Sequence, residues 1–199
     1  MAKNKRNIDA QLKRDEIVTH ALALFQAHGF EDTSMAMISR SAGIAANTIY
    51  WYFAGKDEVL LATLDRLVQS LVAEYQHKRF RSALQSLTWV MDQFSAYKPL
   101  IGAVHARLEQ SPAIREWHER YHQALESFIT AHLTQEGLSP ERAQLMATVG
   151  TFVMEGLLSH PHSTAQRHAI LSWLAGERGS GKTGSAGSIG AKSPLRSPT

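Results

Sequence analysis

The chain contains two short patterns that enzymes use and one that DNA-binding proteins use. Residues 118–122 match H-E-x-x-H, in which two histidines on one helix face bind zinc and the glutamate acts as general base. Residues 176–183 match G-x-x-x-x-G-K-[ST], a loop whose backbone amides cradle phosphate groups. Residues 33–56 fit two short helices joined by a turn at Gly43, with aromatic side chains on the second. The three patterns predict different functions, so the elements around each must decide between them.

The zinc pattern lacks the further ligand that a zinc enzyme needs. In one large class of these enzymes a glutamate follows about twenty residues after the second histidine, where this chain has arginine. The extended version with a glycine and a third histidine also fails, because Leu125 and Phe128 occupy those positions. We therefore assign no metal ligand and no catalytic residue. A zinc-dependent hydrolase using His118, Glu119 and His122 remains the alternative function, and non-catalytic metal binding by the two histidines stays open.

The phosphate-loop pattern requires a strand before it and a helix after it, so that amides and a helix dipole converge on the phosphate. Here a predicted helix precedes the pattern, and a stretch rich in glycine, serine and lysine follows it. Residues 176–199 carry almost nothing apolar and are predicted to be a flexible tail. The match is therefore interpreted as a coincidence of composition, and no cofactor is predicted.

Apolar residues recur at helical spacing along the whole chain, whereas sustained strand-like alternation is absent from the sequence. Glycines at positions 29, 43 and 137 and Ser-Pro pairs at 111–112 and 139–140 supply stop and start signals. We predict helices over about 13–28, 34–41, 45–53, 56–77, 81–96, 99–109, 112–136, 140–159 and 164–174. The fold class is therefore predicted to be all-α.

Composition bounds the function further. The 199 residues are 44% hydrophobic and contain no cysteine, which excludes disulfides, thiolate metal ligands and cysteine nucleophiles. The sequence has no apolar run of the roughly 18 residues that a membrane span needs, and its first residues are polar, so we expect a cytoplasmic protein without membrane contact. Residues 1–14 hold five basic side chains against Asp9 alone. This positive charge would attract DNA phosphates. The alternative is that the segment is a solvated, disordered end of the chain.

The second helix of the predicted helix-turn-helix has an inward and an outward side. If Ile49 and Phe53 face the core, then Thr48 and the aromatic run at 50–52 lie on the outside, where side chains could meet bases and phosphates. The alternative is that these aromatic side chains pack against the following helix.

Residues 13–64 resemble the DNA-binding head of the TetR family of transcriptional regulators. The resemblance is carried by Leu24-Phe25, His28-Gly29-Phe30, Thr33-Ser34, Ala42-Gly43-Ile44, Thr48 to Phe53, and Lys56 to Leu60. It implies a three-helix helix-turn-helix head followed by an all-helical ligand-binding and dimerisation domain. We accordingly expect a basic flexible arm at 1–12, the head at 13–56, the helical domain at 57–175 and the tail at 176–199.

The resemblance also implies a set of DNA-contacting residues. Thr33 or Ser34 would meet a phosphate at the start of the second helix, and Lys56 would hold another. Bases and backbone would be met by the recognition helix, through Ala46, Asn47, Thr48, Tyr50, Trp51 and Tyr52. Family members often carry polar or basic residues where this chain has Ala45 and Ala46, so Asn47 is the main candidate for an adenine contact and DNA shape would contribute to specificity.

For the body, the resemblance implies a small-molecule effector and a homodimer that reads a palindromic operator in double-stranded DNA. Candidate pocket residues are the large aromatic, methionine and histidine side chains of its helices, namely Trp89, Met91, Phe94, Tyr97, His105, Trp117 and Tyr121. Ordinary core packing is the alternative for each of them. The predicted function is a transcriptional regulator, not an enzyme, acting as a repressor that the effector releases from its operator. A helix-turn-helix regulator without a ligand is a further alternative.

Overall fold

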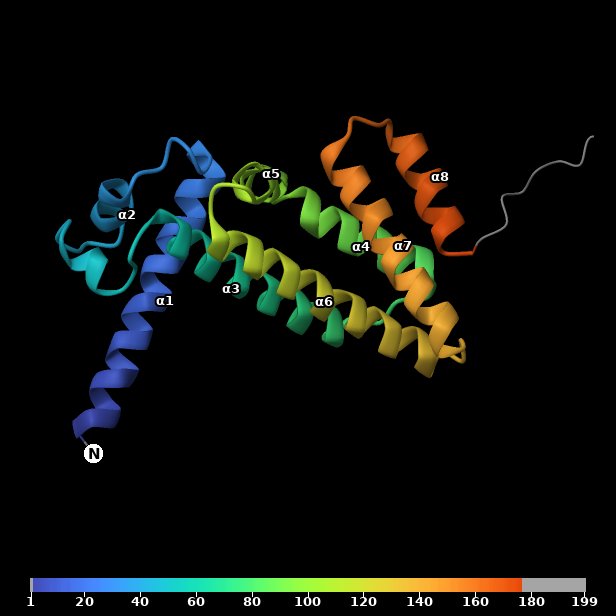
Figure 1. Cartoon of the computed structure of the whole chain (residues 1–199), viewed down its shortest axis with the longest axis horizontal. Coiled ribbons are helices and arrows are strands. Elements are labelled where there is room, and N and C mark those ends of the chain that lie inside the picture. The colour runs from blue at the N-terminus through green and yellow to red at the C-terminus, as the bar shows by residue number, and fades with distance from the viewer. Residues whose placement is uncertain (1, 177–199) are drawn as a thin grey trace, which may run out of the picture.

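The computed structural model describes residues 2–176, in which helices are joined by turns and loops and no strand occurs (Figure 1). The α-helices are α1 (Ala2–His28), α2 (Met35–Ser41), α3 (Lys56–His77), α4 (Ala83–Ser95), α5 (Lys98–Arg107), α6 (Pro112–Gln135), α7 (Pro140–Ser159) and α8 (Thr164–Leu174), with a 3₁₀ helix η1 (Thr48–Trp51) between α2 and α3. The all-α prediction is confirmed, and the stop and start signals of the sequence lie at the helix ends.

The first helix is longer than the sequence predicts. It begins at Ala2 instead of about residue 13, so the stretch expected as a flexible basic arm is helical up to the start of the predicted helix. The physical reason is that no glycine or proline occurs between Ala2 and His28, so nothing in the sequence interrupts the backbone hydrogen bonds. Gly29, at φ 81°, then ends the helix in the left-handed conformation that glycine favours.

The recognition element is shorter than predicted. In place of an α-helix over 45–53, the structure has a turn followed by one 3₁₀ turn, in which the amide of Tyr52 donates to the carbonyl of Ile49 at 3.0 Å. Threonine, isoleucine and aromatic residues are poor helix formers, and the segment lies between Gly43 and Gly55 with too little chain to add turns. Packing of Ile49 and Phe53 therefore determines its conformation.

One apolar core spans the head and the near end of the body. Its buried residues come from α1, α2, η1 and α3, and it continues into α5 through Leu100 and Val104 and into α6 through Ile114. The predicted inward residues Ile17 and Phe25 are fully buried in it. Since α5 and α6 share this core with the helices of the head, a displacement of either helix must be accommodated by the head.

A second, smaller core holds the far end of the body together. It is built from Met91 of α4, Leu157 and Leu158 of α7, and Leu171 of α8. Helices α6 and α7 cross between the two cores (Figure 1). The body therefore consists of two packed groups of helices joined along α6 and α7.

Across residues 2–176, no helix is long and apolar enough to cross a membrane. The phosphate-loop pattern at 176–183 and the predicted flexible tail lie, apart from Gly176, outside the described residues.

Candidate nucleic-acid interface

The start of α2 distinguishes the two hydroxyl residues that the sequence left as alternatives. Ser34 is exposed and caps the helix, since its Oγ accepts the Met37 amide hydrogen at 3.2 Å. Thr33 is fully buried, and its Oγ1 donates to the carbonyl of Gly29 at 2.7 Å. Only Ser34 is therefore placed where a hydroxyl and a helix start could face DNA, while Thr33 fastens the loop behind it.

The turn after α2 presents the recognition element to solvent. Gly43 adopts φ 65°, a conformation that side-chain-bearing residues rarely take, and it lets the chain reverse within two residues. Ile49 and Phe53 then point into the core and are almost completely buried. Their burial decides which side of η1 faces outward.

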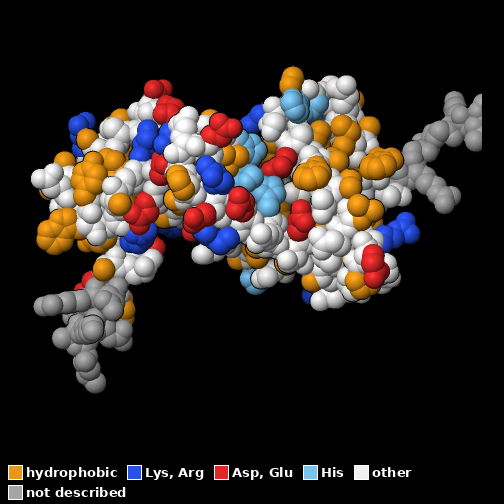
Figure 2. All heavy atoms as spheres, viewed as in Figure 1, with side chains coloured by type: hydrophobic (Ala, Val, Ile, Leu, Met, Phe, Trp, Pro, Cys, Tyr) orange, Lys and Arg blue, Asp and Glu red, His pale blue; other side chains and the backbone are white. Residues whose placement is uncertain are grey.

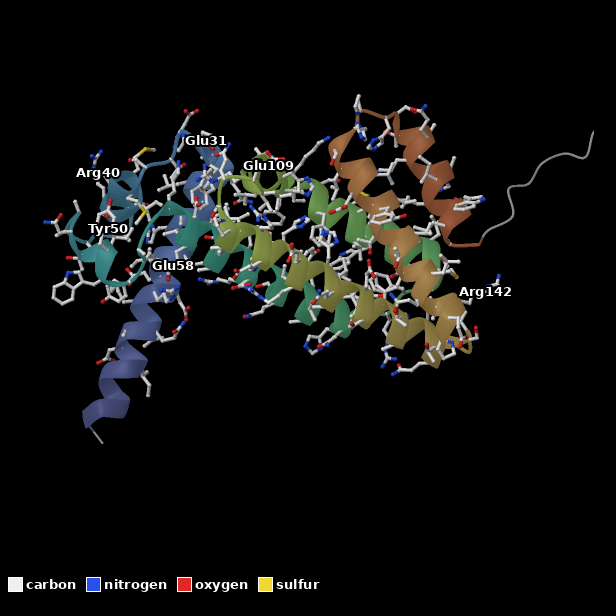
Figure 3. The ribbon with its side chains drawn as sticks, viewed as in Figure 1. Glu31, Arg40, Tyr50, Glu58, Glu109 and Arg142 are labelled. Carbon is white, nitrogen blue, oxygen red and sulfur yellow. The ribbon has the colours of Figure 1, made fainter. Side chains whose placement is uncertain are left out.

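The outward side of η1 carries two large aromatic side chains. Trp51 is 89% exposed and Tyr50 is 56% exposed, and both Ala46 and Asn47 in the preceding turn are exposed as well. Tyr50 lies at the end of the head farthest from the body (Figure 3). An indole this exposed has no packing role within the chain, so a binding role explains it best.

Two of the predicted contact residues lie partly in the core instead. Tyr52 packs against the core of the head, and its carbonyl accepts a hydrogen bond from the Arg14 guanidinium. Thr48 is half-buried at the first position of η1. The structure thus brings together Ala46, Asn47, Tyr50 and Trp51 as one surface and places Tyr52 at its base.

Lys56 links the start of α3 to the loop before α2. Its ammonium group donates to the carbonyls of Phe30 at 2.8 Å and Glu31 at 3.1 Å, and lies 4.2 Å from the centre of the Phe30 ring. The predicted phosphate contact must use the third N–H of this ammonium group or a movement of the side chain.

Two arginines of the head were not among the predicted DNA-contacting residues. Arg40 is exposed on the last turn of α2, and it lies at the same end of the molecule as Tyr50 (Figure 3). Arg14 bridges α1 to α3, where it donates to Glu58 Oε1 at 2.8 Å, and to the segment before α3, where it lies 4.0 Å from the centre of the Phe53 ring. A basic residue on the last turn before the Gly43 turn was the signal for Arg40; Arg14 became recognisable only through its tertiary contacts.

Glu58 is held ionised by its contacts. Partial burial acts to raise its pKa, but the hydrogen bonds from the Ala54 amide, at 2.7 Å, and from Arg14 outweigh burial and lower the pKa below 4.5. Because the folded-state pKa is the lower one, Glu58 contributes stability above pH 4.5, and this contribution is lost as the pH falls through the folded-state pKa.

We expect the Glu58→Gln variant to be less stable than wild type at pH 7 and to approach it in stability at pH 3. The Glu58 side chain is 42% exposed, so solvent screening limits the difference in unfolding free energy to about 1 kcal/mol or less. Urea unfolding at the two pH values measures it. Glu109→Gln, which changes an exposed carboxylate after α5, is the matched control, and an equal pH effect in both variants would contradict the assignment.

The predicted pocket residues are distributed over both cores. Met91 and Phe94 belong to the second core, whereas Tyr97 and Trp117 pack on the first. Trp89 contacts Tyr75 and Phe80, and Tyr121 stacks on Trp117 with ring centres 5.3 Å apart. His105 lines a pocket of the body, about 280 Å³ in volume, together with Lys98, Ile101, Gly102, Leu158 and Ser159.

His105 also faces α6 and α7, where it meets His118 and Glu155, and His122 contacts both of these in turn. Burial lowers the pKa of the His118 imidazole, and the His122 and His105 rings lower it further, against a raising effect of Glu155 and Glu119. Burial and, secondarily, Glu155 raise the pKa of the Tyr121 hydroxyl.

The whole fold matches solved structures of regulators. A crystal structure of a transcriptional regulator from Rhodococcus sp. Rha1 superposes with a TM-score of 0.65, at 20% identity, over 82% of this chain and 94% of that one. A putative TetR-family regulator from Mesorhizobium loti gives a TM-score of 0.61, at 22% identity, over 83% of this chain and 96% of that one. At this identity the likeness concerns the fold.

Sequence comparison adds the family. The HTH-type transcriptional regulator SrpR of Pseudomonas putida is 27% identical in an alignment of 175 positions that covers 77% of this chain and 77% of that protein. The profile described as "Bacterial regulatory proteins, tetR family" matches residues 17–63, from α1 into α3. Residues 17–63 thus form a TetR-type helix-turn-helix head, and the chain is a DNA-binding transcriptional regulator. The matched residues contain the whole turn-and-η1 surface described above.

Proposed function

We propose that this protein is a repressor whose homodimer binds a palindromic operator through Ser34, Ala46, Asn47, Tyr50 and Trp51. The observation that carries the proposal is the exposed Tyr50–Trp51 pair beside the Gly43 turn. Asn47 would read an adenine edge, and the aromatic side chains would contact backbone or thymine methyl groups. Thr48, Tyr52, Thr33 and Lys56 would support this surface, with Arg40 as an added phosphate contact.

The dimer would form through α7 and α8. Leu145, Val149 and Phe152 recur every three or four residues along α7 and are 64%, 37% and 66% exposed, and Trp173 of α8 is 71% exposed. Figure 2 shows apolar side chains gathered over these two helices. Apolar surface of this kind rimmed by polar residues is typical of a protein interface, and two-fold symmetry would give two heads the spacing that a palindrome needs.

An effector bound in the body would act through α5. Arg107, at the end of α5, forms two hydrogen bonds with Asp57 at the start of α3, at 3.0 and 3.2 Å. A ligand that shifts α5 would therefore also displace α3. For the ligand to release the protein from DNA, it must bind the conformation with displaced heads more tightly than the DNA-binding conformation. The pocket beside His105 is the site that supports this role.

We propose that the protein is not the zinc hydrolase of the alternative interpretation. Glu119, the general base of the H-E-x-x-H pattern, is exposed on α6 and lies outside the group formed by His105, His118 and Glu155. A base that does not face the metal cannot activate its water. We likewise propose a cytoplasmic protein with the head at 13–56 and the ligand-binding and dimerisation domain at 57–175.

The test is selection of genomic DNA fragments on the purified protein at physiological salt, followed by sequencing. We expect one enriched palindromic motif, and we expect Tyr50→Ala to weaken binding to it by roughly 1 to 3 kcal/mol. Arg120→Ala, a change at an exposed position of α6 outside the head, is the control for nonspecific charge effects. Recovery of no palindrome, or unchanged affinity in Tyr50→Ala, would contradict the proposal.

A further inference from the structure

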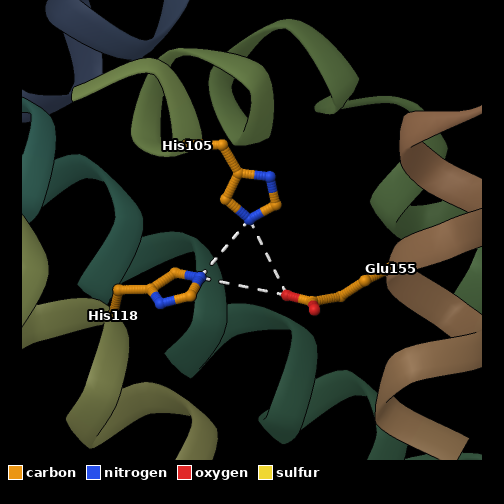
Figure 4. A group of neighbouring side chains, drawn as sticks. All are labelled: His105, His118 and Glu155. Carbon is orange, nitrogen blue, oxygen red and sulfur yellow. Dashed lines mark hydrogen bonds and ion pairs between the residues drawn. The ribbon is translucent and has the colours of Figure 1, made fainter. Parts of the chain in front are cut away.

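Three imidazole rings and one carboxylate converge between α5, α6 and α7. Figure 4 shows His105, His118 and Glu155 pointing toward one another, with the nearest nitrogen of each ring and one carboxylate oxygen facing the centre. His118 Nε2 lies 3.3 Å from His105 Nε2 and 3.1 Å from His122 Nε2. Glu155 Oε1 lies 3.7, 3.9 and 2.9 Å from the Nε2 atoms of His105, His118 and His122.

The helices bring these groups together from distant parts of the sequence. His118 and His122 are one turn apart on α6 and so share a face. His105 comes from the last turn of α5, and Glu155 comes from the part of α7 that crosses α6. Histidine side chains gather at the middle of the molecule, between the head and the α7–α8 end (Figure 2). The two further ligands that the H-E-x-x-H pattern lacks in sequence are thus supplied by neighbouring helices.

Hydrogen bonding among these groups alone does not account for the arrangement. Each contact between two Nε2 atoms needs one ring to donate and the other to accept, and the carboxylate needs a donor as well. Two protonated rings at these distances would repel each other. A cation at the centre satisfies every Nε2 lone pair and the carboxylate charge at once.

The donor spacing fits a first-row transition metal. Zinc lies about 2.0 to 2.1 Å from histidine nitrogen and from carboxylate oxygen, so tetrahedral donors around it are about 3.3 Å apart. The separations among the facing atoms of His105, His118 and Glu155 are 3.3, 3.7 and 3.9 Å, at or slightly above that value. We propose that His105, His118 and Glu155 form a binding site for one divalent transition-metal ion of the zinc class. His122, whose Nε2 lies 3.1 Å from His118 Nε2 and 2.9 Å from Glu155 Oε1, would supply the fourth ligand.

The donor set selects the class of ion. Three imidazoles with one carboxylate suit Zn²⁺ and its neighbours Co²⁺, Ni²⁺ and Cu²⁺, whereas Ca²⁺ and Mg²⁺ prefer oxygen ligands. Four protein donors leave no open coordination position for a reacting water, which is the pattern of structural rather than catalytic zinc. The site therefore revises the sequence-based expectation of no metal ligand without reviving the hydrolase.

The site also has an entry path. His105, 33% exposed, is shared between the cluster and the pocket of about 280 Å³ that Lys98 and Ser159 line. The His118 and His122 side chains lie deeper, at 21% and 19% exposure. An ion can thus reach His105 first and then complete its shell with the α6 and α7 ligands.

The experiment is isothermal titration of the full chain, stripped with a chelator, with ZnCl₂. We expect one Zn²⁺ per chain in wild type and a loss of affinity of about 100-fold or more in both His118→Ala and Glu155→Gln. His132→Ala, which removes an exposed histidine farther along α6, is the matched control and should bind as wild type does. Circular dichroism verifies that each variant remains helical.

A second readout identifies the geometry without relying on a variant. Co²⁺ added to the stripped wild-type protein should give the intense visible absorption of a four-coordinate site, and Zn²⁺ should abolish it. Wild-type affinity equal to that of His118→Ala, or equal losses in His132→Ala, would overturn the proposal, as would only the weak absorption of six-coordinate cobalt. The readout is metal alone, so its result is independent of operator binding.

Discussion

The Phe152→Asp variant is expected to be a monomer where the wild-type protein is a dimer. Phe152 is 66% exposed on α7 in a stripe with Leu145 and Val149, and an aspartate there would place a charge in the desolvated centre of the proposed interface. Sedimentation velocity measures the change directly. Affinity for an operator with two half-sites should fall by about 10² to 10⁴-fold, because binding of one head no longer holds a second head close to the other half-site.

The control for this change is Val72→Asp, which introduces the same charge at a 40% exposed position of α3, away from α7 and α8. It should leave the oligomeric state unchanged. A Phe152→Asp protein that still sediments as a dimer would place the interface elsewhere on the body. A monomeric variant that keeps full operator affinity would instead contradict the proposal that the two heads of a dimer each bind one half-site of a palindrome.

Phe53→Ala is expected to destabilise the head by about 3 to 5 kcal/mol, which is a large part of the stability of an ordinary domain. The Phe53 ring is 1% exposed, packs in the core of the head and lies under the Arg14 guanidinium. Its removal leaves a cavity beneath η1 and frees the segment that orients Tyr50 and Trp51. Chemical unfolding followed by tryptophan fluorescence and circular dichroism measures the loss.

Trp51→Ala separates this effect from DNA contact. Trp51 is 89% exposed, so its removal should change stability by no more than about 0.5 kcal/mol, while operator affinity falls by roughly 1 to 3 kcal/mol. Phe53→Ala should lose both stability and affinity. Equal stability of the two variants would mean that Phe53 does not anchor the recognition element.

The sequence alone determined the positions of most helices and the function that the head serves. Ser-Pro starts and glycine stops are local signals, since a proline at the first helical position and a glycine just past the last act within one turn. Helix positions from α2 to α8 could therefore be predicted, apart from the recognition element. The turn residues and the aromatic run of the head were recognisable because the family resemblance concerns contiguous residues.

The tertiary structure decided matters that depend on contacts between distant residues. Thr33 and Ser34 are adjacent and chemically alike, and only the burial of Thr33 against α1 tells them apart. Likewise, the sequence places Lys56 at the first position of a helix, but the carbonyls that its ammonium group contacts belong to the loop before α2.

The histidine cluster is the clearest case. Sequence spacing identified His118 and His122 as one helix face, because an i, i+4 relation is fixed by the helix itself. His105 and Glu155 are separated from them by a loop on each side, so their approach depends on how α5 and α7 pack on α6. Helix packing angles follow from many side chains at once, which is why the sequence predicted half of this cluster and only the folded chain completed it.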